Sequence, residues 1–265
     1  MMSGSQRLWF WGLAWISVIA LSAPTLVVFG ASFTAGNIIA FPPEGLSLRW
    51  YEKIVLARDL QQAFLRSLIV SAICTMIAVP AGTLAGLAMA RFRLRFGNAI
   101  QMYLLLPFTI PLIGSGIGLM MLFGEMRVLG SLWPVGLACA VINLPFIIWS
   151  VSSSAALLDP DLEHAAANCG AGRIQAFLFV TLPAVMPGVI TGSLLMFILA
   201  MTEFLVSLLL VDARTVTLPV QIYNSIRSII TPDLAAVSVV FIVIAALAIA
   251  LLDRLVGLEI FLKSK

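Results

Sequence analysis

Six apolar runs, each long enough to cross a lipid bilayer, constrain this chain more than any other feature of its sequence. A bilayer core of about 30 Å requires about 20 apolar residues in helical form. Backbone N–H and C=O groups find no water there, so each run must satisfy them internally as a helix. The runs are about Leu8–Phe33, Ala63–Ala90, Ala99–Phe123, Leu132–Ala156, Gly188–Leu210 and Leu234–Leu252. The sequence therefore predicts an all-α membrane protein with six transmembrane helices.

The composition supports a membrane protein and argues against a nucleic-acid partner, a disulfide framework and a metal site. Of 265 residues, 62% are hydrophobic and 10% are charged, whereas a soluble domain carries about 25% charged residues. The net charge of +3 is small and gives no reason to expect a nucleic-acid partner. The three cysteines, Cys74, Cys139 and Cys169, lie far apart and predict neither a disulfide framework nor a metal site.

The first apolar run has a competing interpretation as a secretory signal peptide. Its length and the lack of a small-x-small cleavage site before Pro24 favour an uncleaved helix. Residues 34–62 predict an outside loop with a short interfacial helix, its Trp50 and Tyr51 at headgroup level. We therefore expect residues 1–60 to form the first transmembrane helix and an outside loop, residues 61–256 the membrane core with the polar segment 157–187, and residues 257–265 a cytoplasmic tail.

The orientation follows from the arginines and lysines. The densest basic cluster, Arg91, Arg93 and Arg95, lies in a very short loop, which favours the cytoplasmic side. An even number of helices puts both termini on that side, together with residues 157–187. The predicted opposite side also carries basic residues, several of them in the longer first loop, which counts for less: Arg49, Lys53, Arg58, Arg66, Arg127, Arg214 and Arg227.

Two glycine patterns lie inside the apolar runs. Gly82 and Gly86 are four residues apart, a spacing that permits close helix packing in a bilayer. The run from Gly114 to Gly118 resembles a phosphate cradle only superficially, because it has the wrong spacing and follows no predicted strand. It is better interpreted as part of a tightly packed or broken helix.

The segment Leu157–Pro187 is the only long polar interruption between two strongly apolar segments in the second half of the chain. Asp159 is a candidate helix N-cap, with Pro160 at the first helical position. Asp161 and Glu163 place negative charge in the first turn, where the helix dipole favours it.

The rest of this segment predicts two short helices. Ala165 and Ala166 give the first helix little side-chain bulk, and Gly170 ends it. A second helix follows from about Arg173 to Val180, and Leu182-Pro183 closes the segment. A helix faced with alanine lets a partner backbone come close and suggests docking into a partner's groove. A helix lying on the membrane surface is the alternative.

The spacing of this segment resembles the cytoplasmic E-A-A loop of type I ABC importer permeases, which have the MetI-like permease fold. That loop reads E-A-A, three residues, G, then a downstream hydrophobic-x-L-P, here Val180-Thr181-Leu182-Pro183. His164 stands at the position of the family's glutamate, with Glu163 one residue earlier. The resemblance implies an ATPase-coupling loop built on Glu163, His164, Ala165, Ala166, Gly170, Leu182 and Pro183.

Chemistry-bearing motifs are scarce in the sequence. It has one histidine, no G-x-x-x-x-G-K-[ST] phosphate loop, no G-x-S-x-G and no metal-spaced His/Cys cluster. We therefore expect no enzyme activity, no metal and no cofactor in this chain. Energy for uphill transport would come from another subunit, since a secondary transporter is expected to show coupling carboxylates and repeat symmetry.

Further markers resemble the polyamine-importer branch, most similar to the spermidine/putrescine permease of the second-subunit type. They are Arg49-Trp50-Tyr51, Ser67, Ala90-Arg91-Phe92-Arg93, Leu218 to Tyr223 and Pro232 to Ala236. The resemblance implies a multi-pass bacterial inner-membrane subunit, with a second permease as heterodimer partner and a periplasmic solute-binding protein. It also implies two copies of an ATPase that bind ATP and Mg²⁺. The alternatives are an opine, aminophosphonate, iron or thiamine importer, or a non-transporting membrane scaffold.

Glu203 is the carboxylate inside an apolar run. An ionised carboxylate at that depth costs a few kcal/mol, so it should face a wet cavity or a partner. A structural interpretation is that it pairs with an arginine or hydrogen-bonds across a helix interface. A functional one is that it lines the solute path with Thr202 and Asn143 as neighbours. The polyamine permeases that the chain resembles often carry an acidic residue near this point.

Overall fold

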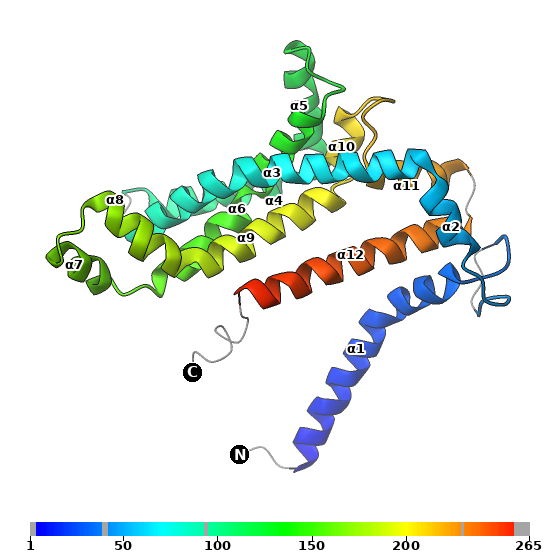
Figure 1. The fold of residues 1–265 in the computed structure, drawn as a ribbon, viewed down its shortest axis with the longest axis horizontal. Helices are drawn as coiled ribbons and strands as arrows, with labels where there is room; N and C mark the ends of the chain where they lie inside the picture. The colour runs from blue at the N-terminus through cyan, green and yellow to red at the C-terminus, as the bar shows by residue number, and fades with distance from the viewer. Residues whose placement is uncertain (1–3, 39–41, 93–94, 229–230, 257–265) are drawn as a thin grey trace. The chain divides into compact units, whose positions relative to one another are not determined.

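The computed structural model describes residues 4–38, 42–92, 95–228 and 231–256, in which the regular structure is helical apart from one isolated β-bridge between Thr34 and Leu46. The predicted all-α fold is confirmed for these residues. The elements are α1 (Gly4–Ser32), α2 (Arg49–Leu56), α3 (Arg58–Arg91), α4 (Gly97–Thr109), α5 (Leu112–Glu125), α6 (Leu132–Ala156), α7 (Asp161–Asn168), α8 (Arg173–Ala176), the π-helical turn η1 (Phe177–Thr181), α9 (Leu182–Thr202), α10 (Leu205–Leu210), α11 (Leu218–Ser228) and α12 (Pro232–Val256) (Figure 1). The predicted tail 257–265 and Arg93 lie outside the described residues.

The chain divides into two compact units, residues 1–61 with 222–247 and residues 62–221 with 248–265. In the first unit, the expected short helix after α1 is present as α2. Trp50 is buried against the loop before it, and its indole N–H donates to the carbonyl oxygen of Thr34 at 2.9 Å. The predicted position of Trp50 and Tyr51 at headgroup level stays a prediction. Lys53 of α2 forms an ion pair with Asp233 of α12 at 2.9 Å.

In the second unit, α3, α6 and α9 run alongside one another (Figure 1). Ile147 of α6 is fully buried between two glycines. A Cβ atom on Gly82 of α3 would lie 2.2 Å from Ile147 Cγ2, and one on Gly192 of α9 would lie 2.9 Å from Ile147 Cγ1. The expected close packing at Gly82 and Gly86 is confirmed, because a Cβ on Gly86 would lie 2.8 Å from the carbonyl oxygen of Ile148.

The third apolar run, predicted as one span over Ala99–Phe123 with a tightly packed or broken helix, consists of two helices. α4 ends at Thr109 and α5 begins at Leu112. The break lies at Ile110, whose ψ is 130°. Pro111 explains it, since proline lacks an N–H and pushes the preceding residue into extended conformation.

The fifth run departs from the prediction. Helical structure continues from Arg173 through η1 to Thr202, so Leu182-Pro183 does not end it and no separate helix starts at Gly188. Pro183 is tolerated because the π-turn before it already rearranges the hydrogen-bond ladder. The helix breaks instead at Glu203 and Phe204, and α10 follows.

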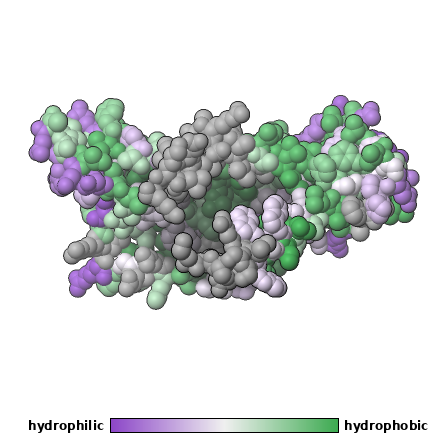
Figure 2. Space-filling view, turned by 90° about the horizontal axis from the view of Figure 1, so that it is seen from below, coloured by the Kyte–Doolittle hydropathy of each residue, from purple (hydrophilic) through white to green (hydrophobic). Residues whose placement is uncertain are grey.

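Within the described residues, four helices are long and apolar enough to cross a membrane, and two shorter helices are apolar. The four are Trp9–Ser32, Arg58–Arg91, Leu132–Ala156 and Arg173–Thr202, and the shorter two are Leu112–Glu125 and Pro232–Ile244. Hydrophobic side chains cover much of the visible surface (Figure 2). The count of six membrane passes and the cytoplasmic termini stay predictions.

The glycine contacts between α3 and α6 yield a stability prediction. Gly86→Ala would place a methyl group against backbone of α6 that cannot rotate away, so we expect destabilisation of about 1–3 kcal/mol. Gly118→Ala in α5 is the control, because nothing lies within 4 Å of its Cβ position. Thermal unfolding of the detergent-purified protein measures both variants. An unfolding midpoint of Gly86→Ala at or above that of Gly118→Ala would contradict tight packing at this contact.

The predicted orientation can be tested with the chain's own cysteines. Cys74 and Cys139 are buried, whereas Cys169, between α7 and α8, is exposed. An impermeant thiol reagent should leave Cys169 unlabelled in intact cells and label it after permeabilisation. Ala213→Cys, at an exposed site in the loop after α10, should be labelled in intact cells when Cys169 is replaced by alanine. The reverse pattern would invert the topology.

Candidate functional site

The segment between α6 and α9 folds as its local sequence predicts at the start of α7. The Asp159 carboxylate accepts a hydrogen bond from the backbone N–H of Asp161 at 3.0 Å, with Pro160 between them. This contact satisfies one of the free N–H groups at the helix start, as expected of an N-cap aspartate. The predicted start of the first helix is confirmed.

The end of α7 is fixed by Gly170. Its φ of +89° is a left-handed conformation that side chains disfavour. The N–H of Gly170 donates to Ala167 at 2.9 Å and that of Ala171 donates to Ala166 at 3.0 Å. These two bonds form a Schellman motif, which occupies carbonyl groups that the helix leaves free. Gly170 is therefore required by backbone conformation, in addition to any close approach by a partner.

The outer face of α7 is open. No residue of the helix is buried, and His164, Ala165 and Gly170 are exposed. Ala166 is half-buried. At the other end of the segment, Leu182 is half-buried and Pro183 exposed in the first turn of α9. The alanine face is thus available to a partner.

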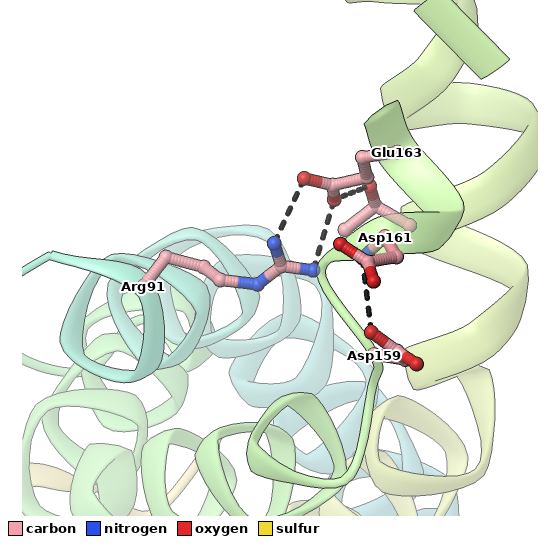
Figure 3. Close-up of polar contacts among 5 residues, drawn as sticks. Arg91, Asp159, Asp161 and Glu163 are labelled. Atoms are coloured by element: carbon pink, nitrogen blue, oxygen red, sulfur yellow. Dashed lines mark hydrogen bonds and ion pairs between the residues drawn. The ribbon is translucent and has the colours of Figure 1, made fainter. Parts of the chain in front are cut away.

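The inward side of α7 is held by Glu163, which receives three hydrogen bonds. Arg91, the last residue of α3, donates from its two terminal nitrogens at 2.8 and 2.9 Å, one to each carboxylate oxygen (Figure 3). The hydroxyl of Thr181, at the end of η1, donates to the same carboxylate. Sequence reasoning missed Arg91 and Thr181 as partners, because they lie 72 and 18 residues from Glu163. His164, at the family's glutamate position, is exposed and has no comparable anchor among the described residues.

A cavity of about 820 Å³ lies between the end of α3 and the segment that carries α7. The residues that line it include the charged or polar Arg91, Glu163 and His164 and the apolar Leu87, Ala167 and Phe177. α3 has 34 residues and is about 51 Å long at about 1.5 Å per residue. Because the hydrocarbon core is about 30 Å thick, the Arg91 end of α3 can lie in water.

Two of the three candidate solute-path residues, Thr202 and Glu203, lie at the break between α9 and α10, whereas Asn143 lies inside α6. Glu203 is half-exposed and extended, with ψ of 120°, and its carboxylate accepts the backbone N–H of Val206 at 3.0 Å. This carboxylate caps the first turn of α10. It satisfies a backbone N–H that the break between α9 and α10 leaves without an intrahelical partner. The structural interpretation from the sequence had expected an ion pair with an arginine or a hydrogen bond across a helix interface instead.

Thr202 and Asn143 make only local hydrogen bonds in the part of the chain described. The Thr202 hydroxyl donates to Ile198 at 3.0 Å within α9, and the buried Asn143 amide donates to Cys139 at 3.0 Å within α6. The structure therefore does not join Glu203, Thr202 and Asn143 in one polar network. Among the described residues, no group of three or more His, Cys, Asp or Glu side chains is placed to hold a metal ion.

Comparison with known proteins identifies the class. Over residues 78–258 the sequence matches the family described as binding-protein-dependent transport system inner membrane component, and the chain belongs to this family. The putrescine transport system permease protein PotI of Escherichia coli is 28% identical over 227 residues, covering 82% of this chain and 80% of the relative. The molybdenum transport system permease protein ModB of Mycobacterium tuberculosis is 31% identical over 231 residues, covering 80% and 87%.

A solved structure shows the same fold. The crystal structure of a bacterial ABC transporter involved in the import of the acidic polysaccharide alginate aligns with a TM-score of 0.63 at 15% identity, covering 100% of this chain and 99% of that one. The protein is thus a permease subunit of an ABC importer and an integral inner-membrane protein, and its family is one of transporter subunits rather than enzymes. Permeases of this kind imply an ATPase and a binding protein as partners.

Proposed function

We propose that the chain forms, with a second permease subunit, the path of a polyamine such as putrescine or spermidine across the inner membrane. Two ATPase subunits bind the ATP and Mg²⁺, one of them docks on residues 157–187 of this chain, and a solute-binding protein delivers the solute from the other side. The observation that carries the docking part is α7 itself, a helix with no buried residue whose one anchoring carboxylate points inward.

The side chains of α7 favour a protein partner over the membrane surface. A surface-lying helix needs a broad face of large apolar residues. The sequence of α7 is DLEHAAAN, in which Leu162 is the one large apolar side chain. Its small alanine face suits close approach by another protein's backbone. For the same reason we disfavour the scaffold alternative, since a scaffold needs no exposed docking helix.

The charge of Glu203 supports a cationic solute. A half-exposed carboxylate at an interrupted helix attracts a polyamine and repels an anion. One relative is named as a putrescine permease, which supports a cationic solute, whereas another is named as a molybdenum permease, which indicates a different solute. We therefore place polyamine first, ahead of the opine, aminophosphonate, iron and thiamine alternatives.

The docking face gives a direct prediction. Ala165→Trp adds bulk to an exposed position of α7 and should overpack the ATPase contact by about 1–3 kcal/mol. Uptake and co-purification of the ATPase should fall while the permease still inserts. Ala213→Trp, equally bulky and exposed, should leave both unchanged. His164→Glu restores the family's residue and should be tolerated in the same assay. Full uptake by Ala165→Trp in an assembled complex would contradict docking through this face.

Glu203→Gln separates solute binding from helix capping. The glutamine oxygen can still accept the Val206 N–H, while the charge is lost. We expect competition assays to show polyamine affinity lowered at least about fivefold, equivalent to about 1 kcal/mol for one charge pair at 4 Å in water. The loss should grow with solute charge, at unchanged complex yield. Glu203→Ala, which also removes the cap, should reduce the yield. Unchanged uptake of every cation by Glu203→Gln would remove Glu203 from the path.

A further inference from the structure

We propose that Arg91 and Thr181 are positioning residues that hold Glu163 and so carry movement of α7 into the helices α3 and α9. The three residues are called the carboxylate clamp below. The inference rests on the proposed docking function, because it concerns what happens to a push that the ATPase exerts on α7.

The geometry singles out one carboxylate as the joint between three elements. Arg91 is the last residue of α3, Glu163 lies in α7, and Thr181 ends η1 and leads directly into α9. Both guanidinium terminal nitrogens of Arg91 donate to Glu163 (Figure 3), and the Thr181 hydroxyl donates to the same carboxylate. A bidentate arginine–carboxylate pair fixes orientation as well as distance. A rotation or shift of α7 therefore pulls on the ends of two long helices at once.

The clamp is more than an ordinary surface ion pair. The side chains of Arg91 and Glu163 are 22% and 32% exposed, so solvent screens the pair only in part. Within the described part of the chain, the Arg91 Nε atom is buried and has no hydrogen-bond partner. A buried donor without a partner is unfavourable and calls for an explanation. We explain it by the position of the guanidinium, which lets both terminal nitrogens bond to Glu163 but leaves Nε without an acceptor.

The docking helix depends on this anchor. An isolated helix of eight residues is not stable in water, so contacts outside α7 must fix its position. None of its residues is buried, which leaves Glu163 as its strongest hydrogen-bonded contact among those described. The partner Thr181 lies at the end of a π-helical turn, a feature that often marks functional sites.

The helices that the clamp reaches are coupled further inside the unit. Gly82 of α3 and Gly192 of α9 both close on Ile147 of α6, with no room for a side chain at either glycine. Packed helices of this kind move as bodies rather than deform. Movement that enters at Arg91 and Thr181 can therefore reach the break at Glu203, at the other end of α9.

The test separates ATP hydrolysis from transport. The complete complex, with partner permease, ATPase and binding protein, is reconstituted in liposomes, and putrescine uptake per ATP hydrolysed is measured. Three variants should retain ATP hydrolysis and lower the ratio of uptake to hydrolysis: Glu163→Gln, Arg91→Lys and Thr181→Val. We expect a decrease of at least about fivefold, which is the lower end of the effect that one site usually has on another through allosteric coupling. Arg95→Ala is the matched control, an exposed arginine beyond the end of α3, and should behave as the parent. The double variant Arg91→Glu with Glu163→Arg exchanges the two charges. Its uptake per ATP hydrolysed should be higher than that of either single variant.

A second readout does not depend on the solute. In a cysteine-free background, Leu205→Cys at the exposed start of α10 reports movement beyond α9. Its thiol reactivity should change with ATP and vanadate in the parent, and this change should disappear in Thr181→Val and Glu163→Gln. An unchanged response in those variants, or no response in the parent, would overturn the proposal. Loss of coupling in Ala165→Trp with normal coupling in the clamp variants would refute the clamp and leave the docking function standing. Normal uptake in Ala165→Trp would refute the docking function instead.

Discussion

The contact of three helices at Ile147 is the packing on which the second unit depends. In a bilayer, apolar burial does not draw helices together, so close backbone approach has to supply the attraction. Gly82 and Gly192 permit that approach from two sides of α6, and Ile147 fills the space between them. Because this core is tightly packed, the polar groups to which we assign functions lie away from it, around Glu163 and around Glu203.

Much of the fold could be predicted from the sequence because each apolar run must become a helix in lipid. The breaks could not. Pro24, Pro80, Pro107, Pro145 and Pro187 stay inside helices, whereas Pro111 lies at the break between α4 and α5, so a proline in an apolar run does not by itself predict a break. The break at Glu203 has no proline or glycine beside it at all. There, a carboxylate that caps the next helix replaces the breaker residue that a sequence search looks for.

The candidate site shows the same division between local and distant information. The N-cap by Asp159 and the left-handed Gly170 involve neighbours in sequence, so turn chemistry predicted both correctly. The pairing of Glu163 with Arg91 was not predicted, because Arg91 was already explained from the sequence as part of the basic cluster that sets the orientation in the membrane. An acidic residue that points back from an exposed helix finds its partner only in the folded structure. The resemblance to the family had singled out His164, because it stands at the family's glutamate position. In the structure, the residue that anchors the helix is Glu163.

Photo-crosslinking from α7 is the most direct test of whether this helix docks on an ATPase rather than lying on the membrane. A benzophenone amino acid at Ala165, in the chain expressed with its partners, samples whatever covers the exposed face of the helix. We expect a covalent product with the ATPase subunit, identified by mass spectrometry, and no such product from the same probe at Ala213. Lipid adducts at Ala165, or equal crosslinking to the ATPase from both positions, would contradict docking through α7.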